Sequence, residues 1–188
     1  MEEYTQSEKD FLLKLARKTI EHFLATGEKL EPLDSDIPFE KLKEKRAAFV
    51  TLTQDGNLRG CIGSLEPQIA LCEEIIDKSL SAAFKDPRFS PLAREELVKT
   101  KIHISILTIP QPPSFKNYEE LLEKLTPKKD GVILKKGFNT ATYLPKVWEE
   151  LPQKQEFLSS LCHKAGLSSD AWKQDIEVWL YQTIDFSE

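Results

Sequence analysis

A hairpin pattern in the first half of the chain constrains the fold more than any other stretch. Strand-forming residues fill positions 48–53 and 58–65, and Asp55-Gly56-Asn57 lies between them. An Asp-Gly turn between two apolar runs is the strongest short-range signal of a β-hairpin. The pattern therefore predicts two antiparallel strands, whose apolar face must be buried against other parts of the chain.

Apolar residues at helical spacing predict a helix before this hairpin. Ser7 and Asp10 resemble a capping box at its start, and Gly27 suits its C-terminal cap. The stripe expected to face the core consists of Phe11, Leu12, Leu15, Ala16, Ile20, Phe23 and Leu24.

The order of elements repeats along the chain. After the first hairpin, the residues that follow Pro67 predict a helix to about Phe84 that Asp86-Pro87 stops, and residues 101–109 predict a strand. The second half again shows a helix, a hairpin, helices and a strand, over residues 118–125, 131–144, 145–165 and 178–184. The repeat favours one α+β body with a largely antiparallel, curled sheet over a chain of separate domains.

Three prolines mark the seam between the two patterns. Pro110, Pro112 and Pro113 break the regular spacing of apolar residues on both sides. We therefore expect a single domain over residues 1–188, with internal halves at about 1–109 and 114–188.

Composition excludes several classes of protein. Hydrophobic residues make up 40% of the 188 and charged residues 30%, which is typical of a soluble globular protein. The net charge of −5, without a basic cluster, argues against a nucleic-acid binder. No run approaches the roughly 18–20 apolar residues of a membrane span, and the acidic N-terminus is unlike a signal peptide. We expect a cytoplasmic protein without a membrane segment.

The three cysteines predict neither disulfides nor a metal site. Cys61, Cys72 and Cys162 are an odd, widely spaced set with no Cys-x-x-Cys pair. The adjacent Cys162 and His163 would point about 100° apart on a helix. Cys72 and Cys162 lie on apolar helical stripes, so we expect them in the core. The chain also lacks a Gly-x-Gly-x-x-Gly or Walker loop, so no cofactor is expected.

Cys61 lies in the segment least explained by packing alone. Glycines at positions 60 and 63 weaken a strand, and such glycines mark a bulge or a close backbone approach. Strand alternation places Arg59, Cys61 and Gly63 on one face, with Leu58 and Ile62 as core residues on the other. Arg59 beside the thiol would favour a reactive thiolate. Alternatively, Cys61 is a small buried hydrophobe and Arg59 a surface ion-pair partner.

The segment Leu58-Arg59-Gly60-Cys61-Ile62-Gly63-Ser64-Leu65 resembles the central motif of the AMMECR-type domain family. In prokaryotes this family is called AmmeMemoRadiSam system protein A. The resemblance continues, in family order, over residues 49–52, 82–89, 104–108, 130–132, 144–149 and 161–167. It therefore covers nearly the whole chain, with a looser match around residues 137–140.

The resemblance implies a fold and partners, but no settled reaction. It implies one α+β domain of two similar helix-hairpin-helices-strand halves around a barrel-like sheet. The gene association reflected in the family name implies a Memo-like protein and a radical-SAM protein as partners. The resulting expectation is an enzyme, or an enzyme-accessory protein, with a cleft site at this strand. The alternative is a non-catalytic module that binds a ligand or a protein, and nucleic-acid binding ranks below both.

The resemblance also selects the candidate site residues. Cys61 is the candidate catalytic residue, a nucleophile for a small anionic substrate or a modified group. The candidates for substrate binding are Arg59, Gly60, Gly63, Asp86 and Arg88. Arg88 suits a bidentate anion contact, or else it forms a turn-locking pair with Asp86. Thiol chemistry needs a base, and either His103 or His163 would have to reach Cys61 through the fold.

Overall fold

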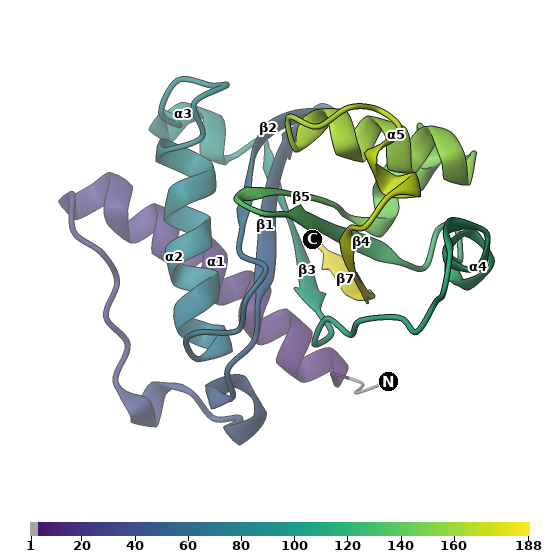
Figure 1. Cartoon of the computed structure of the whole chain (residues 1–188). Helices are drawn as coiled ribbons and strands as arrows, with labels where there is room; N and C mark the ends of the chain where they lie inside the picture. The colour runs from purple at the N-terminus through teal and green to yellow at the C-terminus, as the bar shows by residue number, and fades with distance from the viewer. Residues whose placement is uncertain (1–3) are drawn as a thin grey trace. The chain divides into compact units, whose positions relative to one another are not determined.

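The computed structural model describes residues 4–188, and its helices and antiparallel strands confirm the predicted α+β class (Figure 1). The chain divides into two compact units. Unit 1 comprises the residues up to Leu107 together with Ile184–Glu188, and unit 2 comprises Thr108–Thr183. Hydrogen bonding forms one four-stranded sheet, in the order β2-β1-β3-β7, and one three-stranded sheet, in the order β5-β4-β6. The strands thus form two sheets in place of the one barrel-like sheet that the resemblance implied.

Unit 1 packs two long helices on its sheet, and β7 of this sheet comes from the end of the chain. Its elements are α1 (Gln6–Thr26), η1 (Asp34–Asp36), η2 (Glu40–Lys43), β1 (Ala48–Gln54), β2 (Asn57–Gly63), α2 (Leu71–Phe84), α3 (Arg94–Leu97), β3 (Thr100–Leu107) and β7 (Thr183–Ser187).

The N-cap of helix α1 lies two residues before the predicted one. Thr5 is the N-cap: its hydroxyl oxygen accepts a hydrogen bond from the Glu8 backbone N–H at 3.3 Å. The Glu8 carboxylate accepts in return from the Thr5 backbone N–H at 2.7 Å. Glu8 provides the reciprocal bond of a capping box, so the predicted cap at Ser7 and Asp10 was wrong. The predicted C-cap, Gly27, has the left-handed φ of 77° that ends the helix.

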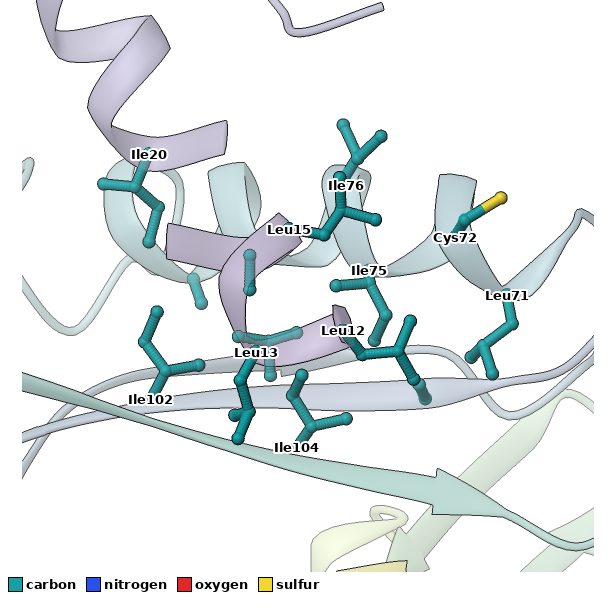
Figure 2. Packing of buried hydrophobic residues seen from close by; sticks show 14 of the residues in the cluster. Leu12, Leu13, Leu15, Ile20, Leu71, Cys72, Ile75, Ile76, Ile102 and Ile104 are labelled. Carbon is teal, nitrogen blue, oxygen red and sulfur yellow. The ribbon is translucent and has the colours of Figure 1, made fainter. Parts of the chain in front are cut away.

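The core of unit 1 lies between the two helices and the sheet. Figure 2 shows Leu12 of α1, Ile75 of α2, and Ile102 and Ile104 of β3 gathered in one apolar layer; all four are fully buried. Helix α2 begins at Leu71 rather than directly after Pro67, because the preceding residues pair with residues 44–46. Burying each such aliphatic side chain contributes about 1.5–3 kcal/mol, so this layer holds the helices on the sheet.

The first hairpin forms as predicted but contains a bulge. Asp55 and Gly56 both have positive φ, 49° and 81°, as a two-residue type I′ turn requires. Leu52 pairs with Gly60, whereas Thr53 pairs with Leu58, so Arg59 is an extra residue in β2. Because of this extra residue, the β2 side chains between the turn and the bulge point to the opposite face from the one that simple alternation predicts. Leu58 is therefore 42% exposed, and the prediction that it belongs to the core was wrong.

The predicted closing strand over residues 178–184 is two strands. β6 (Glu177–Tyr181) pairs with β4 in unit 2, whereas β7 belongs to the sheet of unit 1. The interruption falls at Gln182, whose backbone N–H donates to the Thr108 hydroxyl at 2.8 Å. The break matters for the site, because it adds Asp185 to the sheet that contains Cys61.

Unit 2 has its own core around a stacked pair of aromatic rings. Trp148 lies parallel to Phe157 with ring centroids 3.7 Å apart, and the Trp148 indole N–H donates to the Asp130 carbonyl. The unit contains α4 (Tyr118–Lys124), β4 (Gly131–Lys136), β5 (Asn139–Tyr143), η3 (Pro145–Glu149), α5 (Lys154–Lys164), η4 (Ala171–Lys173) and β6. Among the described residues of both units, no helix has the length and apolar character needed to cross a bilayer.

Candidate functional site

Cys61 lies on the face of the four-stranded sheet opposite the helices. Its neighbour Gly60 faces α2 so closely that a Cβ atom there would lie 2.1 Å from the Ala82 carbonyl oxygen. Ile62, the other neighbour, packs against the core. Strand alternation then directs the half-buried Cys61 to the opposite face, as the sequence predicted.

Thr51 of β1 is the direct cross-strand partner of Cys61. Its hydroxyl donates a hydrogen bond to the Cys61 Sγ at 3.2 Å. The sulfur is therefore the acceptor of a defined hydrogen bond, which fixes its direction on this face of the sheet. Thr51 was missed by the sequence analysis; the bulge in β2 means that counting outward from the turn would have paired Cys61 with the wrong residue.

The Asp86-Pro87-Arg88 turn fastens the backbone of Cys61 from outside the sheet. β2 is an edge strand, whose outward N–H and C=O groups need partners. The Cys61 N–H donates to the Asp86 Oδ2 at 2.9 Å, and the Arg88 Nη2 donates to the Cys61 carbonyl at 3.3 Å. The turn therefore holds both outward groups of Cys61 and keeps its side chain in place.

Asp86 and Arg88 also form a bidentate ion pair. The Arg88 Nε donates to the Asp86 Oδ1 at 2.9 Å and its Nη2 to Oδ2 at 2.6 Å. The hydrogen bonds from this guanidinium are the largest cause of a strongly lowered pKa of Asp86, which is only 4% exposed. Asp86 and Arg88 thus form the turn-locking pair that was one of the two interpretations of the sequence. Arg88 is 53% exposed, and none of the described residues accepts a bond from its Nη1.

Arg59 interacts with Glu96 rather than with the thiol. Its Nε and Nη2 donate to the two carboxylate oxygens of Glu96 at 2.8 and 3.0 Å. Its Nη1 is buried without a hydrogen-bond partner among the described residues. The guanidinium that contacts Cys61 is instead that of Arg88, through the backbone carbonyl. Because Arg59 is the bulged residue, simple alternation did not predict its direction.

Glu96→Gln is expected to remove part of the acid sensitivity of the fold. Hydrogen bonds from Arg59, and then from the Ala93 backbone N–H, lower the pKa of Glu96 from 4.5 to about 2. A lowered folded-state pKa contributes stability above about pH 4.5, and this stability is lost as the pH falls toward 2. The urea midpoint of the parent protein should therefore drop more between about pH 5 and pH 3 than that of Glu96→Gln. Parallel declines would contradict this assignment.

Both glycines of the central motif have a packing role. The missing side chain of Gly60 lets the backbone of α2 pack directly against β2. At Gly63, a Cβ atom would lie 2.2 Å from the Phe49 ring and 2.6 Å from the Ala48 carbonyl oxygen. The expectation of a close backbone approach accounts for both positions. Their role in substrate binding stays a prediction.

His103 lies on the same sheet face as Cys61 and Thr51. The register pairs Thr51 with Cys61 on one side and with His103 on the other. The His103 Nε2 is 3.2 Å from both the Asp185 Oδ1 and the Ser105 Oγ, and the Ser105 hydroxyl donates to the same Asp185 oxygen at 2.6 Å. Nothing in the local sequence predicts that Asp185 lies here, because β7 joins this sheet from the far end of the chain.

The other two cysteines are core residues, as predicted. Cys72 is 5% exposed in the core of unit 1, and Cys162 is fully buried in the core of unit 2. Burial is the main cause that raises the pKa of both thiols. Across residues 4–188, no group of three or more His, Cys, Asp and Glu side chains is placed to hold a metal ion.

Comparisons with known proteins identify relatives over nearly the whole chain. The family model described as AMMECR1 matches residues 13–186. A protein of Methanopyrus kandleri is 39% identical over 196 residues, which cover 100% of this chain and 91% of that protein. A protein of Methanosarcina acetivorans is 41% identical over 191 residues, which cover 98% of this chain and 93% of that protein. The crystal structure of uncharacterized protein PH0010 from Pyrococcus horikoshii has a TM-score of 0.88 and 37% identity, and covers 95% of this chain and 90% of its own.

Proposed function

The chain belongs to the AMMECR1 family, and from that premise we propose that it is an enzyme, or an accessory protein of one, that uses the Cys61 thiol. Its substrate in this proposal is a small anionic molecule or a modified group that binds at β2. The single observation that carries the proposal is the hydrogen bond from the Thr51 hydroxyl to the Cys61 Sγ, at 3.2 Å.

Three features of Cys61 support a reactive role over simple packing. Its side chain is half-buried, whereas Cys72 and Cys162 are buried in apolar cores. Its sulfur has a hydroxyl donor, which a buried hydrophobe does not need. Its backbone N–H and C=O are both held by the Asp86-Pro87-Arg88 turn, so the thiol has a defined direction. Such preorganisation is typical of a group that reacts in one geometry.

Arg88 is the group best placed to bind the anionic part of a substrate. Two of its nitrogens are used by Asp86 and the Cys61 carbonyl, and the side chain is half exposed. A guanidinium fixed in this way can contact a carboxylate or phosphate through Nη1 without losing its ion pair. Arg59 is less suited to this role, because its side chain is only 11% exposed.

Alkylation of the native protein tests the proposal. Cys61 is expected to react with iodoacetamide at pH 7 at least tenfold faster than Cys72, which is 5% exposed and needs local unfolding to react. Thr51→Val should slow Cys61 several-fold because it removes the hydroxyl bond to sulfur. Peptide mass spectrometry after timed labelling measures each site separately. If Cys61 reacts only as slowly as Cys72, the thiol is structural and the proposal fails.

A second candidate function is a binding module that works with the Memo-like and radical-SAM proteins of the associated system. The observation that favours it is the pairing of both guanidinium groups, Arg59 with Glu96 and Arg88 with Asp86. Paired charges suit a preformed docking surface as well as a substrate site. Co-purification that persists in Cys61→Ser, with no turnover in either protein, would favour this function over thiol chemistry.

A further inference from the structure

We infer that His103 is the proton acceptor of the Cys61 thiol, positioned by Asp185. The inference rests on the proposed function and adds the base that it lacks. The carrying observation is a row of side chains on one face of the sheet, one from each of its four strands. The row runs from Cys61 through Thr51 and His103 to Asp185.

The hydrogen bonds assign the free nitrogen of His103. Ser105 and His103 both approach the same Asp185 oxygen; the Ser105 hydroxyl donates to it at 2.6 Å. The His103 Nε2, 3.2 Å from that oxygen, is therefore the protonated nitrogen in the neutral ring. Nδ1 is then the nitrogen with an available lone pair, and none of the described residues bonds to it. A carboxylate that holds one nitrogen and leaves the other as base is the arrangement of catalytic histidines.

Thr51 connects the two ends of the row. Its hydroxyl already bonds to the Cys61 Sγ, and its strand is adjacent to that of His103. One strand spacing is about 5 Å, a gap that a single water molecule spans with two hydrogen bonds. In the proposed step the Thr51 hydroxyl turns to accept the Cys61 proton, its own proton passes to the bridging water, and a proton of that water passes to the His103 Nδ1. The S–H bond of Cys61 breaks and an N–H bond forms at Nδ1, after which the Thr51 hydroxyl donates to the thiolate sulfur. The products are a thiolate and an imidazolium, so charge and atoms balance without an oxidant or a reductant.

The other charged groups on this face are compatible with the transfer. Lys101 lies two residues before His103 on the same face of β3 and is exposed, so water screens its charge. On β1 the neighbours on this face, Thr51 and Thr53, carry no charge. Asp185 on β7 is the anion in contact with the ring, and it stabilises the imidazolium that forms.

His103→Gln tests the inference through the pH profile of Cys61 alkylation. At pH 7 the variant should react with iodoacetamide about threefold to fivefold more slowly, which corresponds to the loss of one charge at about 10 Å in a half-exposed site. At about pH 9.5 the alkylation rates of the variant and the parent protein should converge, because hydroxide from the solvent then deprotonates the thiol without His103. A variant with a merely disturbed fold would differ at both pH values. Asp185→Asn should produce a smaller slowing of the same form.

His22→Gln is the matched control, since His22 lies on α1, outside the row. If Cys61 is fast in the parent protein and His103→Gln leaves the rate at pH 7 unchanged, the inference is wrong while the proposed function stands. If Cys61 is as slow as Cys72 in the parent protein, the proposed function fails, and the inference fails with it. Should His103→Gln not fold, Asp185→Asn gives the same two outcomes.

Discussion

Replacing Gly60 with alanine is expected to lower the free energy of unfolding by about 3 kcal/mol or more. The added Cβ would lie 2.1 Å from the Ala82 carbonyl oxygen and 3.1 Å from its carbon. Both atoms are helix backbone, so no side chain can rotate away, and α2 must move off the sheet. The loss exceeds the few tenths of a kcal/mol to 1 kcal/mol that alanine gains over glycine by restricting the unfolded chain.

Urea unfolding of Gly60→Ala and Leu58→Ala, side by side, measures this effect. Leu58 lies two residues earlier on the same strand and is 42% exposed, so its truncation should cost no more than about 1 kcal/mol. Both variants place an alanine on β2. They differ in environment, because the Cβ added at position 60 meets the backbone of α2, whereas the atoms removed at position 58 are largely exposed to solvent. Equal midpoints would mean that α2 does not press on β2.

Asp86→Ala is expected to cost about 2–4 kcal/mol, the second largest effect. The carboxylate accepts bonds from the Cys61 and Arg88 backbone N–H groups, and both part-buried donors would lose their partner. The Arg88 guanidinium would lose its ion pair, but it is half exposed and can turn to water. The hydrogen bonds that lower the pKa of Asp86 also mean that this stability is present above the ordinary carboxyl range and is lost in strong acid.

Asp77→Ala provides the matched control for Asp86→Ala. Asp77 also forms an ion pair, with Lys29, but both side chains are well exposed at 39% and 48%. Exposed pairs contribute about 0–1 kcal/mol, so this variant should unfold close to the parent midpoint. If the two aspartate variants lose the same stability, the turn at Asp86 does not fasten β2. Calorimetric unfolding at neutral pH is sufficient to decide.

The helices and hairpins could be predicted from sequence because their signals are local. The two-residue turn at Asp55 and Gly56 needs positive φ at both positions, and the residues that tolerate it are visible in the chain. The buried stripe of α1 follows from a spacing of three and four residues. Where these signals were misread, as at Ser7 in place of Thr5, the error was two residues at the end of an element rather than the element itself.

Errors of a different kind came from events that change register or sheet. The bulge at Arg59 inserts one residue into β2. Side chains between the turn and the bulge therefore point to the opposite face of the sheet from the one that simple alternation predicts, and Leu58 is exposed. The break at Gln182 divides the last predicted strand between the two sheets. Neither event alters the local pattern of apolar residues enough to be seen in the sequence.

The sequence by itself determined the element types and the helical faces that form the cores, and it selected the segment around Cys61 as the candidate site. Only the tertiary structure decided which groups surround that thiol. Asp86 is 25 residues from Cys61 in the chain, and His103 and Asp185 are 82 residues apart, yet they contact through strand order and register. Periodicity reports which side of a strand a residue faces. Which strand lies beside it depends on long-range packing, and that packing brings the residues of the candidate site together.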